Sequence, residues 1–311
     1  MKKNFLILAL SIFAICSCSK DDKEKDFPIV GNLSISGECS PSMTRPTTWI
    51  PSDSLGVFVT SDGKTQSNLL YLPSKTAEDK SVDLGGELYH MYGSSVGNVA
   101  LKPNSESIGF KQGNHVIYAY YPYKKSNADL TKVEIADLSV QDDSYQGMSA
   151  NPNLSFGYAI ANVAEYSVSN IDLGAFKSKY TLINTGSISF KDDFVGKTIT
   201  SIEVSCKSNG VNAVIAYKNP VFDFTTEKIV GEECNSIKYN CNMKVESSYF
   251  GPSAGPAIIV IGIPYAEAKK ASYTFKFTFD NGTTLEVKDT TPANMEVGEG
   301  SLSFYDKIKF E

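Results

Sequence analysis

Cysteines, histidines and carboxylates are the side chains with which this sequence could do chemistry, and their spacing favours structural roles. Beyond the N-terminal region, no cysteine pair has the Cys-x-x-Cys spacing of a zinc site. The only histidines are His90 and His115, and His115 falls in a strand-like pattern, where a structural histidine is commoner than a general base. Carboxylates occur in solvated runs such as residues 78–80, and there is no nucleophile elbow, phosphate loop or dinucleotide fingerprint. We therefore expect no enzyme activity, no metal site and no cofactor.

Four of the cysteines lie in the part of the chain that should fold, and an exported protein could oxidise them. Cys39, Cys206, Cys234 and Cys241 allow three complete pairings. Cys206 falls in an alternating strand pattern, so a bridge to Cys234 or Cys241 is one interpretation. Buried thiols are the other, and the sequence leaves both open.

The N-terminal region carries the pattern for a different chemistry, covalent lipidation. A short basic head precedes an apolar run at residues 5–15, which is shorter than the roughly 20 residues of a membrane-spanning helix. The run ends in Ile-Cys-Ser-Cys, which resembles a bacterial lipobox. Cys18 is the better candidate for lipidation because a small residue precedes it and an aliphatic residue lies three positions before it. We expect a lipoprotein signal peptide at 1–17 and a lipidated tether at 18–30. An ordinary secretory signal with an incidental cysteine is the alternative.

Size and charge limit the partners that this chain can have. Removal of the signal leaves about 290 residues, enough for two domains of ordinary size. The formal net charge is -6, and adjacent basic residues beyond the tether occur only as pairs such as 124–125 and 269–270. Because phosphate binding needs clustered Lys and Arg, no nucleic-acid partner is expected.

Short alternating patterns separated by Gly, Asn and Pro turns predict an all-β protein. Asn-Gly turns at residues 209–210 and 281–282 indicate two hairpins. There is no alternation of strands with helices, which favours β-sandwiches. A composition change near residues 162–176 predicts an N-terminal β-sandwich at 31–165 and a C-terminal β-sandwich at 170–311.

Alternating segments lie near both ends of the mature chain. Leu33, Ile35 and Cys39 share one face of the first segment. The last segment has four apolar residues on one face, with Asp306 as the exception: Leu302, Phe304, Ile308 and Phe310.

Several of these features occur in the order typical of one family. The lipobox and the short first strand precede Thr44-Arg45, and Trp49 follows. Next comes Asp-Ser-Leu-Gly-Val-Phe at residues 53–58, and later Ala-Tyr-Tyr-Pro-Tyr at 119–123. This order resembles the fimbrillin family of Bacteroidetes, the type V pilus proteins. The residues after Cys18, Ser-Lys-Asp-Asp, resemble the export tag of surface lipoproteins in such bacteria.

The resemblance implies a fold and a mode of assembly. Fimbrillins have two tandem transthyretin-like β-sandwich domains and are exported as lipoproteins to the outer membrane. In polymerising members a protease cuts after an arginine near the first strand, and a neighbouring subunit's strand fills the groove that this strand leaves. Here Arg45 would be the cleavage site, and Leu33 and Ile35 would belong to the removable strand. The apolar face of residues 302–310 would be a candidate donor, and the expected partners are other pilin subunits and a host or bacterial surface ligand.

One departure from the family pattern bears on the role of this chain. Arg45 is followed by Pro46, and trypsin-like proteases cleave Arg-Pro bonds poorly. Arg45 is also the only arginine in the sequence. We therefore expect an anchor, tip or accessory subunit of the fimbria rather than the shaft subunit.

A surface glycan-binding lipoprotein is the alternative function. Sugar platforms favour exposed aromatic rings, and Trp49 or the group Tyr120, Tyr121 and Tyr123 could form one. Because Tyr120 and Tyr121 point to opposite faces of a strand, at least one of them should be in the core.

Overall fold

The computed structural model describes a nearly all-β protein, which confirms the predicted fold class. The described residues are 35–39, 49–76, 82–83, 88–89, 98–109, 113–142, 156–163, 171–179, 181–184, 188–245, 249–250, 259–262, 271–290, 302–304 and 308–309. Over these ranges there is no α-helix, and the one 3₁₀ turn is η2 (Asp192–Phe194). None of the described helical structure is long and apolar enough to span a membrane.

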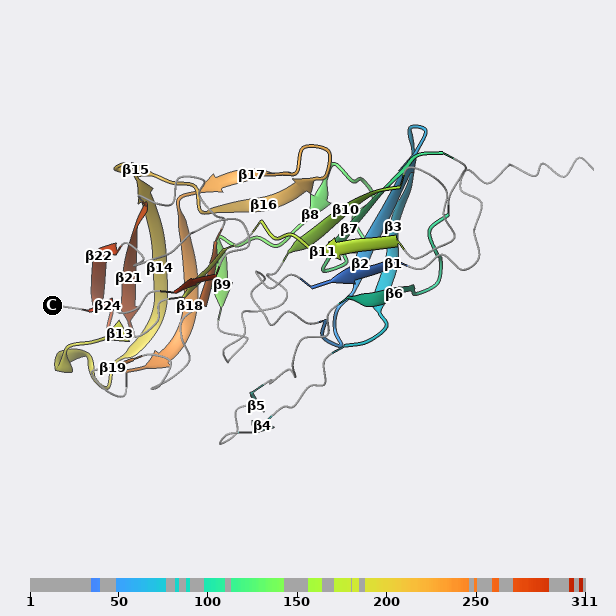
Figure 1. Cartoon of the computed structure of the whole chain (residues 1–311). Helices are drawn as coiled ribbons and strands as arrows, with labels where there is room; N and C mark the ends of the chain where they lie inside the picture. The colour runs from blue at the N-terminus through green and yellow to red at the C-terminus, as the bar shows by residue number, and fades with distance from the viewer. Residues whose placement is uncertain are drawn as a thin grey trace, which may run out of the picture.

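The first half of the chain forms a seven-stranded sheet with the order β10-β7-β2-β3-β6-β1-β11 (Figure 1). Its strands are β1 (Ile35–Glu38), β2 (Leu55–Ser61), β3 (Lys64–Pro73), β6 (Val99–Pro103), β7 (His115–Tyr121), β10 (Gly157–Val163) and β11 (Ile171–Ala175). A separate small hairpin pairs β4 (Val82–Asp83) with β5 (Leu88–Tyr89). Between β2 and β3, Asp62 and Gly63 have positive φ values of 48° and 74°, as a tight hairpin turn requires.

The second half contributes most strands of the remaining sheets. The largest contains β22 (Thr284–Thr290), β21 (Ala271–Phe279), β14 (Thr198–Ser208), β18 (Ser236–Lys244) and β9 (Val140–Asp142), with β15 (Val211–Asn212) paired to β14. A second contains β17 (Lys228–Cys234), β16 (Ala216–Asp223) and β8 (Val133–Glu134). Two more sheets join β20 (Ile259–Gly262), β12 (Thr181–Asn184) and β23 (Leu302–Phe304), and β19 (Tyr249–Phe250), β13 (Ile188–Ser189) and β24 (Ile308–Lys309). The two predicted Asn-Gly turns connect β14 to β15 and β21 to β22, and both strand pairs are antiparallel.

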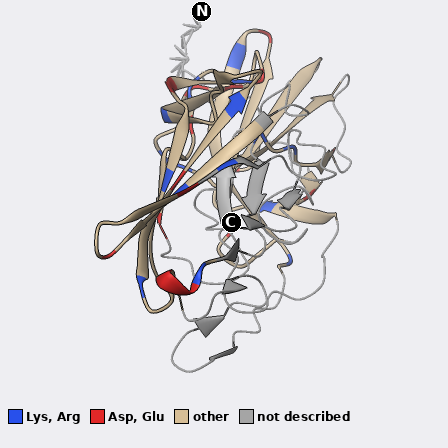
Figure 2. Ribbon diagram, turned by 90° about the vertical axis from the view of Figure 1, so that its left-hand side faces the viewer, with Lys and Arg blue, Asp and Glu red and all other residues tan. Residues whose placement is uncertain are grey.

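Opposite charges face one another across the largest sheet. Glu203 of β14 is in register with Lys238 on one side and Lys276 on the other, and Lys276 is in register with Glu286. Figure 2 shows positive and negative segments scattered over the described strands. Such cross-strand pairs each stabilise a sheet by roughly 0.2–1 kcal/mol.

The seven-stranded sheet has a hydrophobic core on each of its faces. Tyr120 and Tyr121 are neighbours on β7, yet Tyr120 belongs to one core and Tyr121 to the other. Along β2 the same alternation places Phe58 in the first core and Val57 in the second. Both tyrosines are therefore buried, one on each face.

Two glycines make room for these tyrosines. Gly56 of β2 is in register with Tyr120, and a Cβ on Gly56 would lie 2.1 Å from Cε1 of the Tyr120 ring. Gly157 of β10 is in register with Tyr121, and its Cβ would lie 2.5 Å from Cε1 of that ring. The glycine in the segment 53–58 is thus the steric complement of Tyr120, the first tyrosine of the pair in 119–123.

Strand pairing crosses the predicted division between residues 165 and 170. β8 pairs with β16, and β9 runs parallel to β18, so residues of the first half extend sheets of the second. β11, which follows residue 170, pairs with β1 of the first sheet. The division into 31–165 and 170–311 stays a prediction about folding units, but it does not coincide with the borders of the sheets.

The β16–β17 hairpin joins the two halves through aromatic contacts and a polar network. In Figure 1 the hairpin runs from the sheet of β14 and β18 towards β10. Phe222 lies 4.6 Å from Tyr158, and Phe224 lies 5.3 Å from Tyr118, measured between ring centroids. These contacts place β16 against the face of the first sheet that carries Tyr120.

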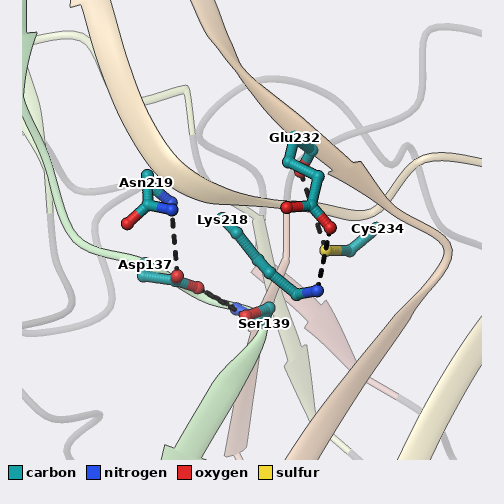
Figure 3. A network of polar contacts seen from close by, with 6 residues as sticks. All are labelled: Asp137, Ser139, Lys218, Asn219, Glu232 and Cys234. Carbon is teal, nitrogen blue, oxygen red and sulfur yellow. Dashed lines mark hydrogen bonds and ion pairs between the residues drawn. The ribbon is translucent and has the colours of Figure 1, made fainter.

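A bulge in β16 supports the polar part of this junction. The backbone N–H of Asn219 donates to Asp137 Oδ2 at 3.3 Å, while Asp137 Oδ1 accepts from the Ser139 hydroxyl at 2.6 Å (Figure 3). The ammonium of Lys218 lies 2.9 Å from Glu232 Oε1 on β17, and this pairing raises the pKa of Lys218. The side chain of Asp137 thereby attaches the segment 137–139 to the backbone of the bulged strand.

Candidate strand-exchange site

β1 is an internal strand of the seven-stranded sheet although it comes first in the described chain. It pairs antiparallel with β6, with Ile35 opposite Leu101, and parallel with β11, with Ile35 opposite Ile171. Ile35 is 0% exposed and Cys39 is 3% exposed, while Glu38 is exposed. Removing β1 would therefore leave two unpaired strand edges and an apolar trough between them.

Trp49 holds β1 by a hydrogen bond as well as by packing. Its side chain is fully buried, and Nε1–H donates to the carbonyl oxygen of Gly37 at 3.2 Å. The following turn fixes the approach, because Asp53 Oδ2 accepts from the backbone N–H of Ile50 at 2.7 Å. The sequence pattern did not predict this bond.

Three aromatic rings form the wall behind β1. The Trp49 ring meets Tyr121 and Phe176 edge-on, with centroid distances of 5.3 and 5.4 Å. Tyr121 and Phe176 are 5.6 Å apart. Each of these geometries is worth about 0.5–1.5 kcal/mol beyond burial, so the three rings stabilise one another.

The C-terminal end of β1 is tied to β11 through backbone and side-chain bonds. The backbone N–H of Phe176 donates to the carbonyl of Glu38 at 2.9 Å. The Ser36 hydroxyl donates to Asp172 Oδ1 at 3.4 Å, and the register shifts between Ser36 and Glu38. Sequence reasoning missed Phe176 and Gly37, although an isolated glycine within a strand pattern is a signal of a bulge or a close approach.

The C-terminal candidate donor segment lies in two strands of the second half. Leu302 and Phe304 are in β23, which runs parallel to β12, and Ile308 is in β24, which runs parallel to β13. Leu33, Cys18, Arg45 and Phe310 lie outside the described residues. The structure thus does not bring the two candidate exchange segments into one sheet among the pairings that it describes.

The aromatic residues considered for sugar binding are mostly core residues. Trp49, Tyr120 and Tyr121 are at most 1% exposed, while Tyr123 is half-buried. Burial and hydrogen bonds from Asn127 and Lys124 act on Tyr120, with burial the larger effect, and its pKa is raised to about 12. A stacking platform needs exposed ring faces, so the first three rings do not offer one.

Cys206, Cys234 and Cys241, for which a disulfide was one of two interpretations, are present as thiols in the structure. Burial raises the pKa of the Cys206 thiol to about 11, with Tyr273 as a hydrogen-bonding neighbour. The Cys234 thiol donates to the carbonyl of Glu232 at 3.7 Å (Figure 3), and the Cys241 thiol donates to the carbonyl of Ile199 at 3.5 Å. The interpretation as thiols therefore fits Cys206, Cys234 and Cys241 in the structure. Over the described ranges, no cluster of three or more His, Cys, Asp or Glu residues could hold a metal ion.

Comparison with solved structures finds proteins to which this chain is similar. A candidate cell adhesion protein from Bacteroides uniformis superposes with a TM-score of 0.51 at 16% identity, over 89% of this chain and 92% of that chain. A candidate cell adhesion protein from Bacteroides ovatus gives a TM-score of 0.47 at 14% identity, over 84% and 86%. The tip fimbrial protein Mfa3 from Porphyromonas gingivalis, with a C-terminal truncation, gives 0.32 at 10% identity, over 82% and 80%. No protein-family model and no curated protein matches the sequence.

The comparison with the Bacteroides uniformis protein defines the protein by its fold. The chain has the all-β fold of the Bacteroides uniformis protein along nearly its whole length. This shared fold is consistent with the resemblance to the fimbrillin family that the sequence motifs carry.

Proposed function

We propose that this chain is a structural or adhesive component of a type V pilus, assembled by β-strand exchange at the place of β1. The observation that carries the proposal is the position of β1, which is paired on both sides, buried against Trp49 and followed by the single arginine of the sequence. A cut after Arg45 would leave β1 held by non-covalent contacts alone. An incoming strand could then supply both the backbone hydrogen bonds and the apolar side chains.

The proposal includes export as a surface lipoprotein through Cys18 to the outer membrane. It is supported by the lipobox-like sequence and by structural neighbours that are named for adhesion and for a fimbrial tip. Other pilin subunits would be the partners, and a host or bacterial surface molecule would be the ligand of an adhesive subunit. Because Arg45 precedes a proline, we propose an anchor, tip or accessory position rather than the shaft.

The composition of purified fimbriae tests this proposal. Fimbriae from the producing bacterium should contain the chain in a small, fixed ratio to the shaft subunit. Deleting its gene should change the length, attachment or adhesion of the fimbriae without abolishing the shaft. Absence of the chain from fimbriae would contradict a role in the pilus, and its presence as the bulk protein would contradict the minor role.

A further inference from the structure

The position of Gly37 in β1 has no room for a side chain. A Cβ on Gly37 would lie 3.0 Å from Cε2 of Phe176, and 3.6 Å from both Leu173 Cβ and the Gly174 carbonyl. The first distance is well below an ordinary carbon–carbon contact. The Phe176 ring cannot easily move away, because it is buried and is held by Trp49 and Tyr121. A residue larger than glycine at this register would therefore displace the aromatic wall.

The carbonyl of the same residue satisfies a buried donor. Trp49 Nε1–H donates to Gly37 O, and the indole is fully buried. If β1 leaves, the replacing strand must present a carbonyl at this place, or the indole N–H loses its partner in the core. One residue of the strand must therefore lack a side chain, because of Phe176, and also present its carbonyl oxygen to Trp49.

We propose that the place of β1 is selective, and that it accepts a strand with glycine at the register of Gly37. The selecting residues are Phe176, which excludes a side chain, and Trp49, whose buried indole N–H requires a carbonyl oxygen at this place. Ile35 and Cys39 are buried, so the strand carries a large aliphatic residue two positions before the glycine and a small apolar residue two positions after it. This inference rests on the proposed strand exchange, for which it specifies the chemistry of the partner strand.

The chain's own C-terminal segment does not meet this requirement. Residues 302–310 contain no glycine. Any register that keeps this face in phase with Ile35 places a side chain on the position of Gly37, either a large apolar one or that of Asp306. The occupant is therefore a strand other than residues 302–310, and a cut chain does not polymerise through this segment.

Peptide replacement in the cut protein tests the selectivity. Because Arg45 is the only arginine, a Pro46→Ala variant of the chain from residue 19 can be cut at one bond by an arginine-specific protease. Isotope-labelled peptides of residues 31–40 with Gly, Ala or Val at position 37 are then offered, and the retained strand is identified by native mass spectrometry. Relative to glycine, we expect alanine to bind about 10-fold more weakly and valine at least about 100-fold more weakly, as overpacking against a rigid ring requires.

Two further peptides sharpen the comparison. A peptide with Glu38→Gln should bind like the native one, because Glu38 is exposed. A peptide of residues 301–311 should bind as poorly as the valine peptide. Equal binding of the glycine and valine peptides would overturn the selectivity.

Measurements on the uncut chain test the selectivity independently of strand exchange. If no peptide enters the cut protein, the proposed exchange fails, and the steric claim is then decided by denaturation of the uncut variants. Gly37→Ala should lower the urea midpoint in the native background and lower it less in a Phe176→Leu background, where the ring is absent. The same loss in both backgrounds would overturn the role of Phe176.

Discussion

The hydroxyl of Tyr158 donates a hydrogen bond of 2.8 Å to the carboxylate of Glu227, and so connects β10 to the tip of the β16–β17 hairpin. Glu227 occupies the left-handed region with a φ of 52°, and its carboxylate also lies 3.7 Å from the ammonium of Lys177. Tyr158 and Glu227 lie on opposite sides of the division predicted between residues 165 and 170. This contact is one end of a junction that continues through Phe222 and Phe224 to the pairing of β8 with β16.

We predict that the halves remain associated after the chain is cut between them. A specific protease sequence inserted between residues 165 and 170 would separate them covalently, while β8, β9 and the aromatic junction still cross the cut. After cleavage, both fragments should elute together in size-exclusion chromatography under native conditions. Fragments that separate and fold alone would show that 31–165 and 170–311 are independent sandwiches.

Truncating the junction should destabilise the whole protein. Phe224 is 2% exposed and contacts the rings of Phe58 and Tyr118, so Phe224→Ala should cost about 3–5 kcal/mol of unfolding free energy. Val230 on the same hairpin is 58% exposed, and Val230→Ala is the matched control, with an expected change within about 0.5 kcal/mol. Urea denaturation followed by circular dichroism measures both. A loss at Phe224 no greater than that at Val230 would argue against the junction.

Stability should fall in alkaline solution because of buried tyrosines. Burial raises the pKa of Tyr71 and of Tyr120 from 10.0 to about 12 in each case. Between these pH values the unfolded chain has released protons that the folded chain keeps, so unfolding becomes easier as the pH rises. Tyr71→Phe should flatten the decline of the urea midpoint between pH 10 and 12. The substitution also removes the hydrogen bond from the backbone N–H of Ile108, so the midpoint of the variant at pH 8 serves as the reference for that loss. An unchanged slope would mean that Tyr71 does not titrate in this way.

Lipidation should depend on Cys18. Metabolic labelling with a clickable palmitate should mark the native protein and fail on Cys18→Ala, because the lipobox-like segment ends at this residue. Cys16→Ala is the matched control and should keep the label. Labelling that follows Cys16 instead would move the anchor, and no labelling of the native protein would favour an ordinary secretory signal.

Local patterns in the sequence predict the strands well because each has a direct physical cause. The Asn-Gly turns at 209–210 and 281–282 adopt hairpins, and the adjacent Tyr120 and Tyr121 divide between two cores as the two-residue period of a strand requires. These features depend only on neighbouring residues.

The sequence pattern could not predict which strands pair with one another over long distances in the chain. Nothing in the short segments β8 and β9 specifies that they pair with β16 and β18, because two or three residues match many registers equally well. Likewise, the burial of Trp49 against Gly37 depends on where β11 brings Phe176. The alternating residues located the candidate site in the sequence. The contacts of Trp49, Tyr121 and Phe176 behind β1 could be found only in the three-dimensional structure.

A disulfide lock on β1 tests strand exchange most directly. Ser36 and Asp172 are in register on β1 and β11, so Ser36→Cys with Asp172→Cys, added to the Pro46→Ala chain, could bond the strand in place under oxidation. After cutting at Arg45, the unlocked protein should exchange its N-terminal strand for a labelled 31–40 peptide, and the locked protein should exchange only after reduction. Variants that carry Ser36→Cys or Asp172→Cys alone control for the effect of each substitution. Failure of the reduced and unlocked proteins to release their first strand to the peptide would contradict assembly at the place of β1.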